Sequence, residues 1–191
     1  LEVALVSDRD ADEAGAALSV KAGSFDDTLL GLAHFHEHML FLGTQKYPEE
    51  DDYEKYLSSN GGACNAWTSD DTTCYYFNVN AASLEGALDR LAQFFVAPTL
   101  EKDAVEREVK AVDSEYRMAL QDDGWRLHSV LKATAKQDHP FARFSTGSEQ
   151  TLLEKAGGVD GLHSELKKWN RAYYNSGNMR LAVVGRESLE E

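Results

Sequence analysis

Four ionisable residues, one of them His36, lie inside an apolar segment of the chain, and this combination limits how the segment can fold. His34, Glu37 and His38 are surrounded by leucine, alanine, phenylalanine and methionine, and the apolar positions of residues 29–42 recur with helical spacing. Gly43 follows where a helix typically ends. The segment therefore predicts a buried or half-buried helix, in which ionisable side chains need partners because burying them alone is costly.

The spacing of the three residues indicates that the partner is a metal. His34 and His38 are four positions apart, so they project from the same face of a helix, and Glu37 falls on the same side. Two imidazoles placed in this way can share one tetrahedral zinc ion. The order His-x-x-Glu-His is the zinc-peptidase pattern His-Glu-x-x-His reversed, the inverzincin motif. The alternative is a polar patch on a surface helix, which the apolar neighbours disfavour. His36 lies on the opposite side of the helix and is not expected to bind the metal.

A second helical segment, residues 106–120, offers a further ligand. A catalytic zinc ion normally has three protein ligands and one open position, and Glu115 is the best candidate for the third. Glu108 precedes Glu115 by seven residues, about two helical turns, so the two carboxylates share a face. One can reach the metal while the other supports a histidine through a hydrogen bond. The alternative is that both are solvated residues of a charged helix.

Four separated stretches of the chain resemble the insulin-degrading-enzyme (pitrilysin) family of zinc metallopeptidases. They are HFHEHMLFLGTQKYP, NAWTSDDTTCYYFNV, REVKAVDSEYRMAL and HPFARFSTG, in the family's order and with matching gaps. The resemblance extends over essentially the whole chain. It implies that one zinc ion is held by His34, His38 and Glu115. It also implies that Glu108 supports a metal-binding histidine without binding the metal itself, and that Glu37 is the catalytic residue.

The resemblance further implies where a substrate binds. Asn65, Ala66 and Trp67 match an edge strand that pairs with the substrate backbone in the family, and the asparagine helps to hold the carbonyl of the cleaved bond. A peptide added to a sheet edge is bound by its backbone, which tolerates many sequences. Phe41, Trp67 and Trp125 match aromatic positions that line the pocket just past that bond. Each aromatic residue could equally belong to the hydrophobic core.

These features predict a zinc-dependent endopeptidase that hydrolyses peptide bonds of peptides or small unfolded polypeptides. Zinc lowers the pKa of a bound water and polarises the substrate carbonyl, while Glu37 acts first as general base and then as general acid. One alternative is a non-catalytic structural or peptide-binding subunit of the same fold, but such proteins usually lack motif residues that are all present here. Another is a zinc hydrolase of other amides or esters, which the edge-strand match disfavours.

Hydrophobic periodicity and turn residues predict a mixed succession of strands and helices. The expected strands cover residues 1–7, about 16–22, 63–69, 73–80 and 179–185. The expected helices cover residues 29–42, 48–60, 84–97, 101–135 with a break near 122–124, and 159–174. Short hairpin signals favour antiparallel pairing. The resemblance implies an α+β fold in which an antiparallel (mixed) β-sheet is backed by helices, as one copy of the pitrilysin-type metallopeptidase domain.

No repeat, low-complexity tract or linker divides residues 1–191, so we expect a single domain, which the resemblance identifies as an N-terminal catalytic domain. The chain begins inside an apparent strand and without methionine, and we expect it to be an excerpt of a longer chain. Cys64 and Cys74 flank a hairpin turn and could face each other across its strands, with reduced thiols as the expected state.

Charge and hydropathy limit the partners of the chain. A net charge of −14 argues against nucleic acid, whose phosphates need a basic surface. No run of 18 or more apolar residues occurs, so no membrane span is expected. The resemblance implies peptide substrates, and a C-terminal half of the same enzyme that closes a chamber around them. A cytoplasmic location is favoured, and an organellar one is compatible with the sequence.

Overall fold

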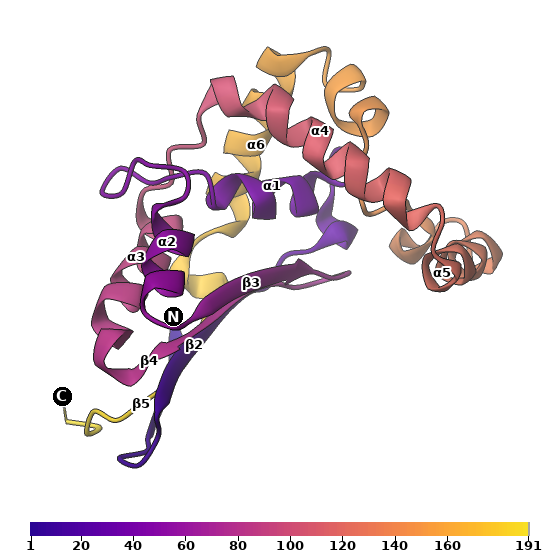
Figure 1. Ribbon diagram of the computed structural model, residues 1–191. Helices are drawn as coiled ribbons and strands as arrows, with labels where there is room; N and C mark the ends of the chain where they lie inside the picture. Colours follow the sequence, from indigo (N-terminus) through magenta and orange to yellow (C-terminus); the bar gives the residue numbers. More distant parts are fainter. Residues whose placement is uncertain (191) are drawn as a thin grey trace.

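A five-stranded mixed sheet forms the base of the structure, and the helices lie on one of its faces (Figure 1). The computed structural model describes residues 1–190. The strands are β1 (Glu2–Ser7), β2 (Glu13–Val20), β3 (Ala63–Thr68), β4 (Thr73–Asn80) and β5 (Met179–Gly185). Their spatial order is β1-β5-β2-β4-β3, with β1 and β5 parallel and the other neighbours antiparallel. The predicted α+β fold with a mixed sheet is confirmed.

The strands alternate between a buried face under the helices and an open face. In β4, Tyr75 and Phe77 are buried, whereas Tyr76 and Asn78 are exposed. β2 shows the same period of two, which is expected for a sheet covered on one side. β2 begins at Glu13, earlier than predicted, because its first residues pair with the far end of β4.

The two cysteines point to opposite faces of the sheet, so the expectation that they could face each other is wrong. Cys64 lies opposite Phe77, and Cys74 lies opposite Trp67. Residues directly opposite each other share a face, and successive residues alternate. Because Phe77 is buried and Trp67 is exposed, Cys64 faces the helices and Cys74 faces the open side. Both cysteines are free in the structure, and their reduced state stays a prediction.

The helices follow the predicted order with some shifted boundaries. The predicted interruption near residue 122 is confirmed as the gap between α4 and α5, whereas α2 begins four residues later than expected. This delay arises because the Thr44 N–H donates to the Tyr47 carbonyl at 2.8 Å and the residues that follow form turns. The helices are α1 (Leu32–Leu40), α2 (Asp52–Ser59), α3 (Leu84–Val96), α4 (Lys102–Ala119), α5 (Asp123–Thr134) and α6 (Val159–Tyr173).

The start of α1 is held by the side chain of Asp27. Its carboxylate accepts hydrogen bonds from the backbone N–H groups of Gly31 and Ala33, both at 2.8 Å. Amides in the first turn of a helix have no partner within the helix, so this contact caps α1. Gly31 has a φ of 92°, and a Cβ there would lie 2.2 Å from the Cα of Gly147. The two glycines therefore allow the loop around residue 147 to pack directly on the beginning of α1.

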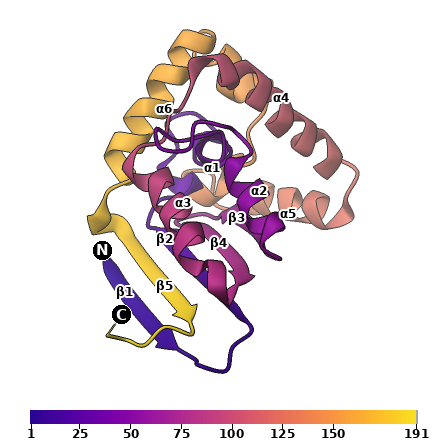
Figure 2. The ribbon, with the colours of Figure 1, turned by 60° about the vertical axis from the view of Figure 1, so that its left-hand side comes forward.

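α1 lies between the sheet and α4, at the centre of the core. Leu32, Phe35, Met39 and Leu40 are fully buried, and α4 and α6 both pack against this helix (Figure 1). α4 continues past the edge of the sheet, and α5 lies beyond that edge. β1 and β5 form the opposite edge, farthest from β3 (Figure 2). Within residues 1–190, no helix combines the length and apolar character needed to cross a membrane.

Candidate metal centre

Three side chains from α1 and α4 converge on one point. α1 carries His34 and His38 one turn apart, on the side where it meets α4. Their Nε2 atoms are 3.2 Å apart. Oε2 of Glu115 lies 3.5 Å from Nε2 of His34 and 3.6 Å from Nε2 of His38. One ligand atom from each residue lies within 4.8 Å of the others. The structure thus brings together the three residues that the sequence predicts as metal ligands.

The other ring nitrogen of each histidine has an acceptor. Nδ1 of His34 donates to the backbone carbonyl of Thr146 at 2.6 Å, and Nδ1 of His38 donates to Oε1 of Glu108 at 2.7 Å. A carbonyl or carboxylate oxygen can only accept, so the proton of each neutral ring lies on Nδ1. Both Nε2 atoms are consequently left with a lone pair directed at the common point.

This set of donors fits a zinc ion. Two lone pairs and a carboxylate oxygen face one another at 3.2–3.6 Å, which is repulsive unless a cation or a proton lies among them. Two ligand atoms that are each about 2.1 Å from a tetrahedral zinc ion are about 3.4 Å apart, close to the separations found here. Imidazole nitrogen and carboxylate oxygen are also ordinary zinc ligands.

The charges around the histidine pair favour a cation. Burial and the neighbouring His38 lower the pKa of His34. Burial would also lower the pKa of His38, but its hydrogen bonds with Glu108 and Glu115 raise that pKa to about 10. The hydrogen bond with His38 lowers the pKa of Glu115, so its carboxylate is ionised at neutral pH. Positive charge between the two rings is therefore stabilised by the carboxylates of α4.

Glu37 lies beside the cluster but is not one of its three donors. The residue is only 7% exposed to solvent, and this burial raises the pKa of its carboxyl group above the usual value. The hydroxyl of Thr68 donates a hydrogen bond to Oε2 of Glu37, which opposes part of that rise. A carboxyl group with a raised pKa beside a cation site is suited to accept and release a proton.

A cavity of about 420 Å³ opens over these groups. Besides the histidines and glutamates, it is lined by Phe41 at the end of α1 and by Asn65 and Ala66 of β3. Phe41 also packs edge-on against Phe94, with ring centroids 5.1 Å apart, so it contributes both to the core and to the cavity wall. The cavity therefore joins the candidate metal site to the sheet.

β3 is the last strand in the sheet and presents its free edge beside this cavity. The backbone N–H of Ala66 donates to Oδ1 of Asn65 at 2.8 Å, which holds the asparagine side chain against the strand. An edge strand has backbone groups that lack a strand partner and can add an extended peptide. Both residues thus lie where the predicted substrate-binding edge requires them, and their role stays a prediction.

The two tryptophans predicted to contact substrate do not line the cavity. Trp67 is 47% exposed and lies on the open face of the sheet, because side chains alternate along β3 and Ala66 takes the cavity side. Trp125 is 54% exposed on α5, in a separate small groove beside Tyr116. Its distance from the cavity follows from the position of α5 beyond the sheet edge. Contact of either tryptophan with a substrate stays a prediction.

His36 is directed away from the cluster, as its place in the helix predicts. It is fully buried and accepts a hydrogen bond from Nδ2 of Asn170 at 3.1 Å. Its ring lies 4.1 Å from the ring of Tyr174, measured between centroids. His36 therefore belongs to the packing between α1 and the end of α6.

Two contacts at the site carry no recognisable signal in the sequence. The acceptor for His34 is a backbone carbonyl, which a residue of any type at position 146 could supply. Thr68 precedes the hairpin turn and becomes a partner of Glu37 only through the packing of β3 against α1. Reading the sequence residue by residue therefore misses both contacts.

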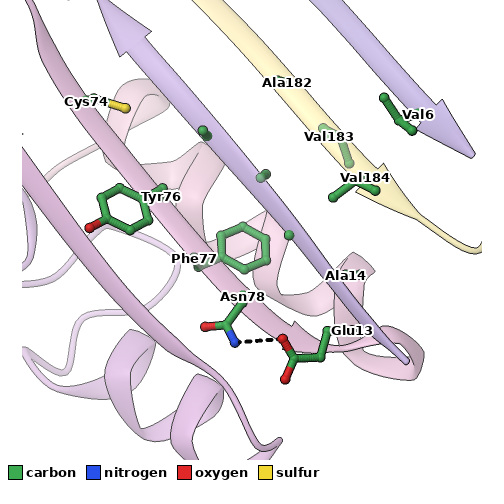
Figure 3. Close-up of a pocket in the computed structure, with 13 residues that line it drawn as sticks. Val6, Glu13, Ala14, Cys74, Tyr76, Phe77, Asn78, Ala182, Val183 and Val184 are labelled. Atoms are coloured by element: carbon green, nitrogen blue, oxygen red, sulfur yellow. Dashed lines mark hydrogen bonds between the residues drawn. The ribbon is translucent and has the colours of Figure 1, made fainter. Parts of the chain in front are cut away.

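A larger groove, of about 500 Å³, lies on the open face of the sheet (Figure 3). It is lined by residues of β2, β4 and β5, including Tyr76 and Val184. At one end, Asn78 donates a hydrogen bond to Glu13 at 3.1 Å. None of the predicted metal-binding or catalytic residues borders this groove. The candidate chemistry lies with the smaller cavity on the helix side.

Comparison with known sequences identifies close relatives. A family model described as insulinase (peptidase family M16) matches residues 2–144. Over its full length the chain is 49% identical to "Insulin-degrading enzyme-like 1, peroxisomal" of Arabidopsis thaliana and 47% identical to insulin-degrading enzyme of Homo sapiens. The chain spans 20% and 19% of these two relatives, about a fifth of their length.

Comparison with solved structures identifies the same family as the comparison of sequences. The crystal structure of pitrilysin matches with a TM-score of 0.92 and 38% sequence identity. The match covers 98% of this chain and 20% of pitrilysin. The family model covers well over half of the chain, and the structural match includes the elements that carry the histidine and glutamate cluster. The chain therefore belongs to the insulinase family of peptidases, peptidase family M16.

Proposed function

We propose that this chain carries the metal site and the general base of a zinc-dependent endopeptidase. The observation that carries the proposal is the convergence of His34, His38 and Glu115, with the free nitrogen of each ring facing the same point. Family membership supports a peptidase. Since the chain spans about a fifth of its relatives, we place the activity in a full-length protein of their size.

In this proposal His34, His38 and Glu115 hold the zinc ion, and the Thr146 carbonyl and Glu108 keep the two rings in the orientation that binds it. When bound, zinc supplies a Lewis acid that polarises the peptide carbonyl and makes a water acidic enough to attack it. The carboxylates on α4 offset the charge of the cation.

Glu37 moves the proton. It takes one from the attacking water as that water adds to the peptide carbonyl, and it delivers the proton to the nitrogen of the leaving amine. The raised pKa that burial gives Glu37 makes both steps accessible near neutral pH. The hydrogen bond from Thr68 holds one of its oxygens, so the other is the one available for proton transfer.

The free edge of β3 suits an extended peptide. Asn65 and Ala66 border the cavity, and a substrate paired with this edge would pass over the metal site, with Phe41 as an apolar wall. Trp67 and Trp125 would contact parts of the substrate outside the cavity. Peptides and small unfolded polypeptides can offer an extended backbone segment without losing structure of their own. A C-terminal half of the same enzyme would close the open side.

The test uses the full-length protein, its metal content and the hydrolysis of a quenched fluorogenic peptide. Wild type should contain about one zinc per chain, and His38→Ala should lose most of it. Glu37→Gln should keep zinc and peptide affinity but lose turnover by about 10²-fold or more, because the general base is gone. Glu106→Gln is the matched control, since this exposed carboxylate of α4 pairs only with Lys110 in the structure.

Three results would contradict parts of the proposal. Undiminished hydrolysis by Glu37→Gln would exclude Glu37 as the base. Full zinc content and activity in Glu115→Gln would show that the third ligand is a different residue. A wild type that binds peptides but never cleaves them would favour the alternative of a non-catalytic, peptide-binding subunit.

A further inference from the structure

The hairpin formed by β3 and β4 provides a hydrogen-bond donor to the buried carboxylate of α1. Thr68 is the last residue of β3, and its hydroxyl donates to Oε2 of Glu37. Among residues 1–190, Thr68 is the side chain that hydrogen-bonds this carboxylate, which also borders the cavity over the candidate metal site. Fixing one carboxylate oxygen fixes the plane of the group and the position of its second oxygen.

The direction of this hydrogen bond follows from the number of available protons. Thr73 lies opposite Thr68, with their Oγ1 atoms 3.4 Å apart. Thr73 is 1% exposed, and its hydroxyl donates to the carbonyl oxygen of Ala22 at 2.9 Å. A threonine hydroxyl has one proton, and an ionised carboxylate can only accept. The proton of Thr68 is therefore the one given to Glu37, and neither threonine has a proton left to donate to the other.

The turn that carries Thr68 is anchored to the segment that follows β2. The N–H of Ser24 donates to the carbonyl of Ser69 at 3.0 Å, and the N–H of Phe25 donates to that of Asp70 at 2.7 Å. A Cβ at Gly23 would lie 2.4 Å from the Ser69 carbonyl oxygen, so a side chain there would push the turn away. These backbone contacts therefore fix the position of the hairpin end that carries Thr68.

We propose that Thr68 is a positioning residue for the proton transfer at this site: its hydroxyl holds one oxygen of Glu37 so that the other stays in place to serve the reacting water. This inference rests on the proposed peptidase function. It adds a residue of β3 to a proton-transfer site whose candidate metal donors lie on α1 and α4. Thr73 and Ala22 take part because the hydrogen bond between them leaves the Thr68 proton free for Glu37.

The kinetic test compares Thr68→Val, Thr68→Ser and Thr72→Val in the full-length protein. Valine has the shape of threonine without the hydroxyl, so kcat should fall about 10- to 100-fold while KM changes less than about twofold, as expected for a misplaced catalytic group. Serine retains the hydroxyl and should restore kcat to within about threefold of wild type. Thr72→Val makes the same change in the same hairpin, where the hydroxyl contacts Asp71 instead, and should leave kcat and KM unchanged.

Zinc content, measured for every variant, separates this inference from a general loss of the site. Content equal to wild type in Thr68→Val, together with rescue by serine, supports positioning. Wild-type kcat in Thr68→Val overturns the inference while leaving the proposed function intact. A fall in kcat that serine does not rescue also overturns it, because the hydroxyl would not be the cause.

A second measurement does not depend on activity. Crystal structures of the full-length Thr68→Val and Thr68→Ser variants should show the Glu37 carboxylate rotated in the first and in its wild-type position in the second. An unmoved carboxylate in Thr68→Val would refute the positioning role even if the wild type cleaved no peptide. Failure of the proposed function, by contrast, would appear as an inactive wild type in which the rotation still occurs.

Discussion

Each histidine of the candidate metal centre is oriented by an acceptor on its second ring nitrogen, and the two acceptors differ in kind. For His34 the acceptor is a backbone carbonyl, which substitution cannot remove. For His38 it is the carboxylate of Glu108, whose side chain is only 14% exposed. The contribution of such an acceptor to metal affinity can therefore be measured at His38.

Glu108→Gln should weaken zinc binding by about 10- to 100-fold, because a neutral amide holds the ring less firmly and makes its nitrogen a weaker donor. At saturating zinc, turnover should stay within about threefold of wild type, since the ligands themselves are unchanged. Competition with a chromophoric chelator measures the affinity. Glu106→Gln, on an exposed position of the same helix, should bind zinc like wild type. Equal affinity in both variants would mean that Glu108 does not support His38.

At the level of single elements, α1 depends on its capping carboxylate. Burial raises the pKa of Asp27 to about 7. In an unfolded chain an aspartate has a pKa of about 3.9. Between these two pKa values the folded protein keeps a proton on Asp27 that the unfolded chain releases. The contribution of this proton to the free energy of unfolding is fully present below about pH 4 and is lost as the pH rises through about 7.

Asp27→Asn should remove this dependence, because the amide does not titrate. The amide oxygen can accept one of the two backbone hydrogen bonds, and the loss of the other lowers stability equally at every pH. The quantity to compare is the difference in the free energy of unfolding, wild type minus Asp27→Asn. This difference should fall by more than about 1 kcal/mol between pH 4.5 and 8. Urea denaturation at a series of pH values measures the difference. Asp10→Asn, in the exposed connection between β1 and β2, serves as the control and should parallel wild type. A constant difference for Asp27→Asn would refute the shifted titration.

Periodicity predicted most elements of this fold, and their boundaries were less predictable. α1 follows from apolar spacing, since helical geometry is local and repeats regularly, and α4 follows from its composition. The starts of β2 and α2 were misplaced, because strand length depends on which partner strand is available and a helix start depends on turns that compete for the same residues. Such competition is decided by contacts between distant segments.

At the scale of the whole molecule, the donors of the candidate metal site all lie within this chain, whereas the proposed substrate-binding edge is open. The donors come from α1 and α4, both within this chain, whereas among residues 1–190 no strand pairs with the outer edge of β3. The relatives are about five times as long as the chain. Catalysis also needs groups directed at the developing oxyanion and exclusion of water, which a one-sided site does not supply.

The 191-residue segment by itself should therefore bind zinc yet cleave a fluorogenic peptide at less than about 1% of the full-length rate. Addition of the remaining part of the protein as a separate chain should restore activity if the two surfaces associate. The assay compares the segment alone, the mixture and the full-length protein, with zinc content measured in each. Full-length rates from the segment alone would show that no second wall is needed.

The sequence by itself determined the chemistry of the candidate site, while only the tertiary structure decided its surroundings. The shared face of His34 and His38 and that of Glu108 and Glu115 follow from the helical repeat, which depends on the residues of one helix alone. The donation from Thr68 to Glu37 and the outward position of Trp67 depend on the register of β3, where a shift of one residue would exchange the two faces. The carbonyl of residue 146 reaches His34 only because distant glycine backbones pack together. Local periodicity can be read from residue order, whereas strand register and long-range packing result from the folding of the whole chain.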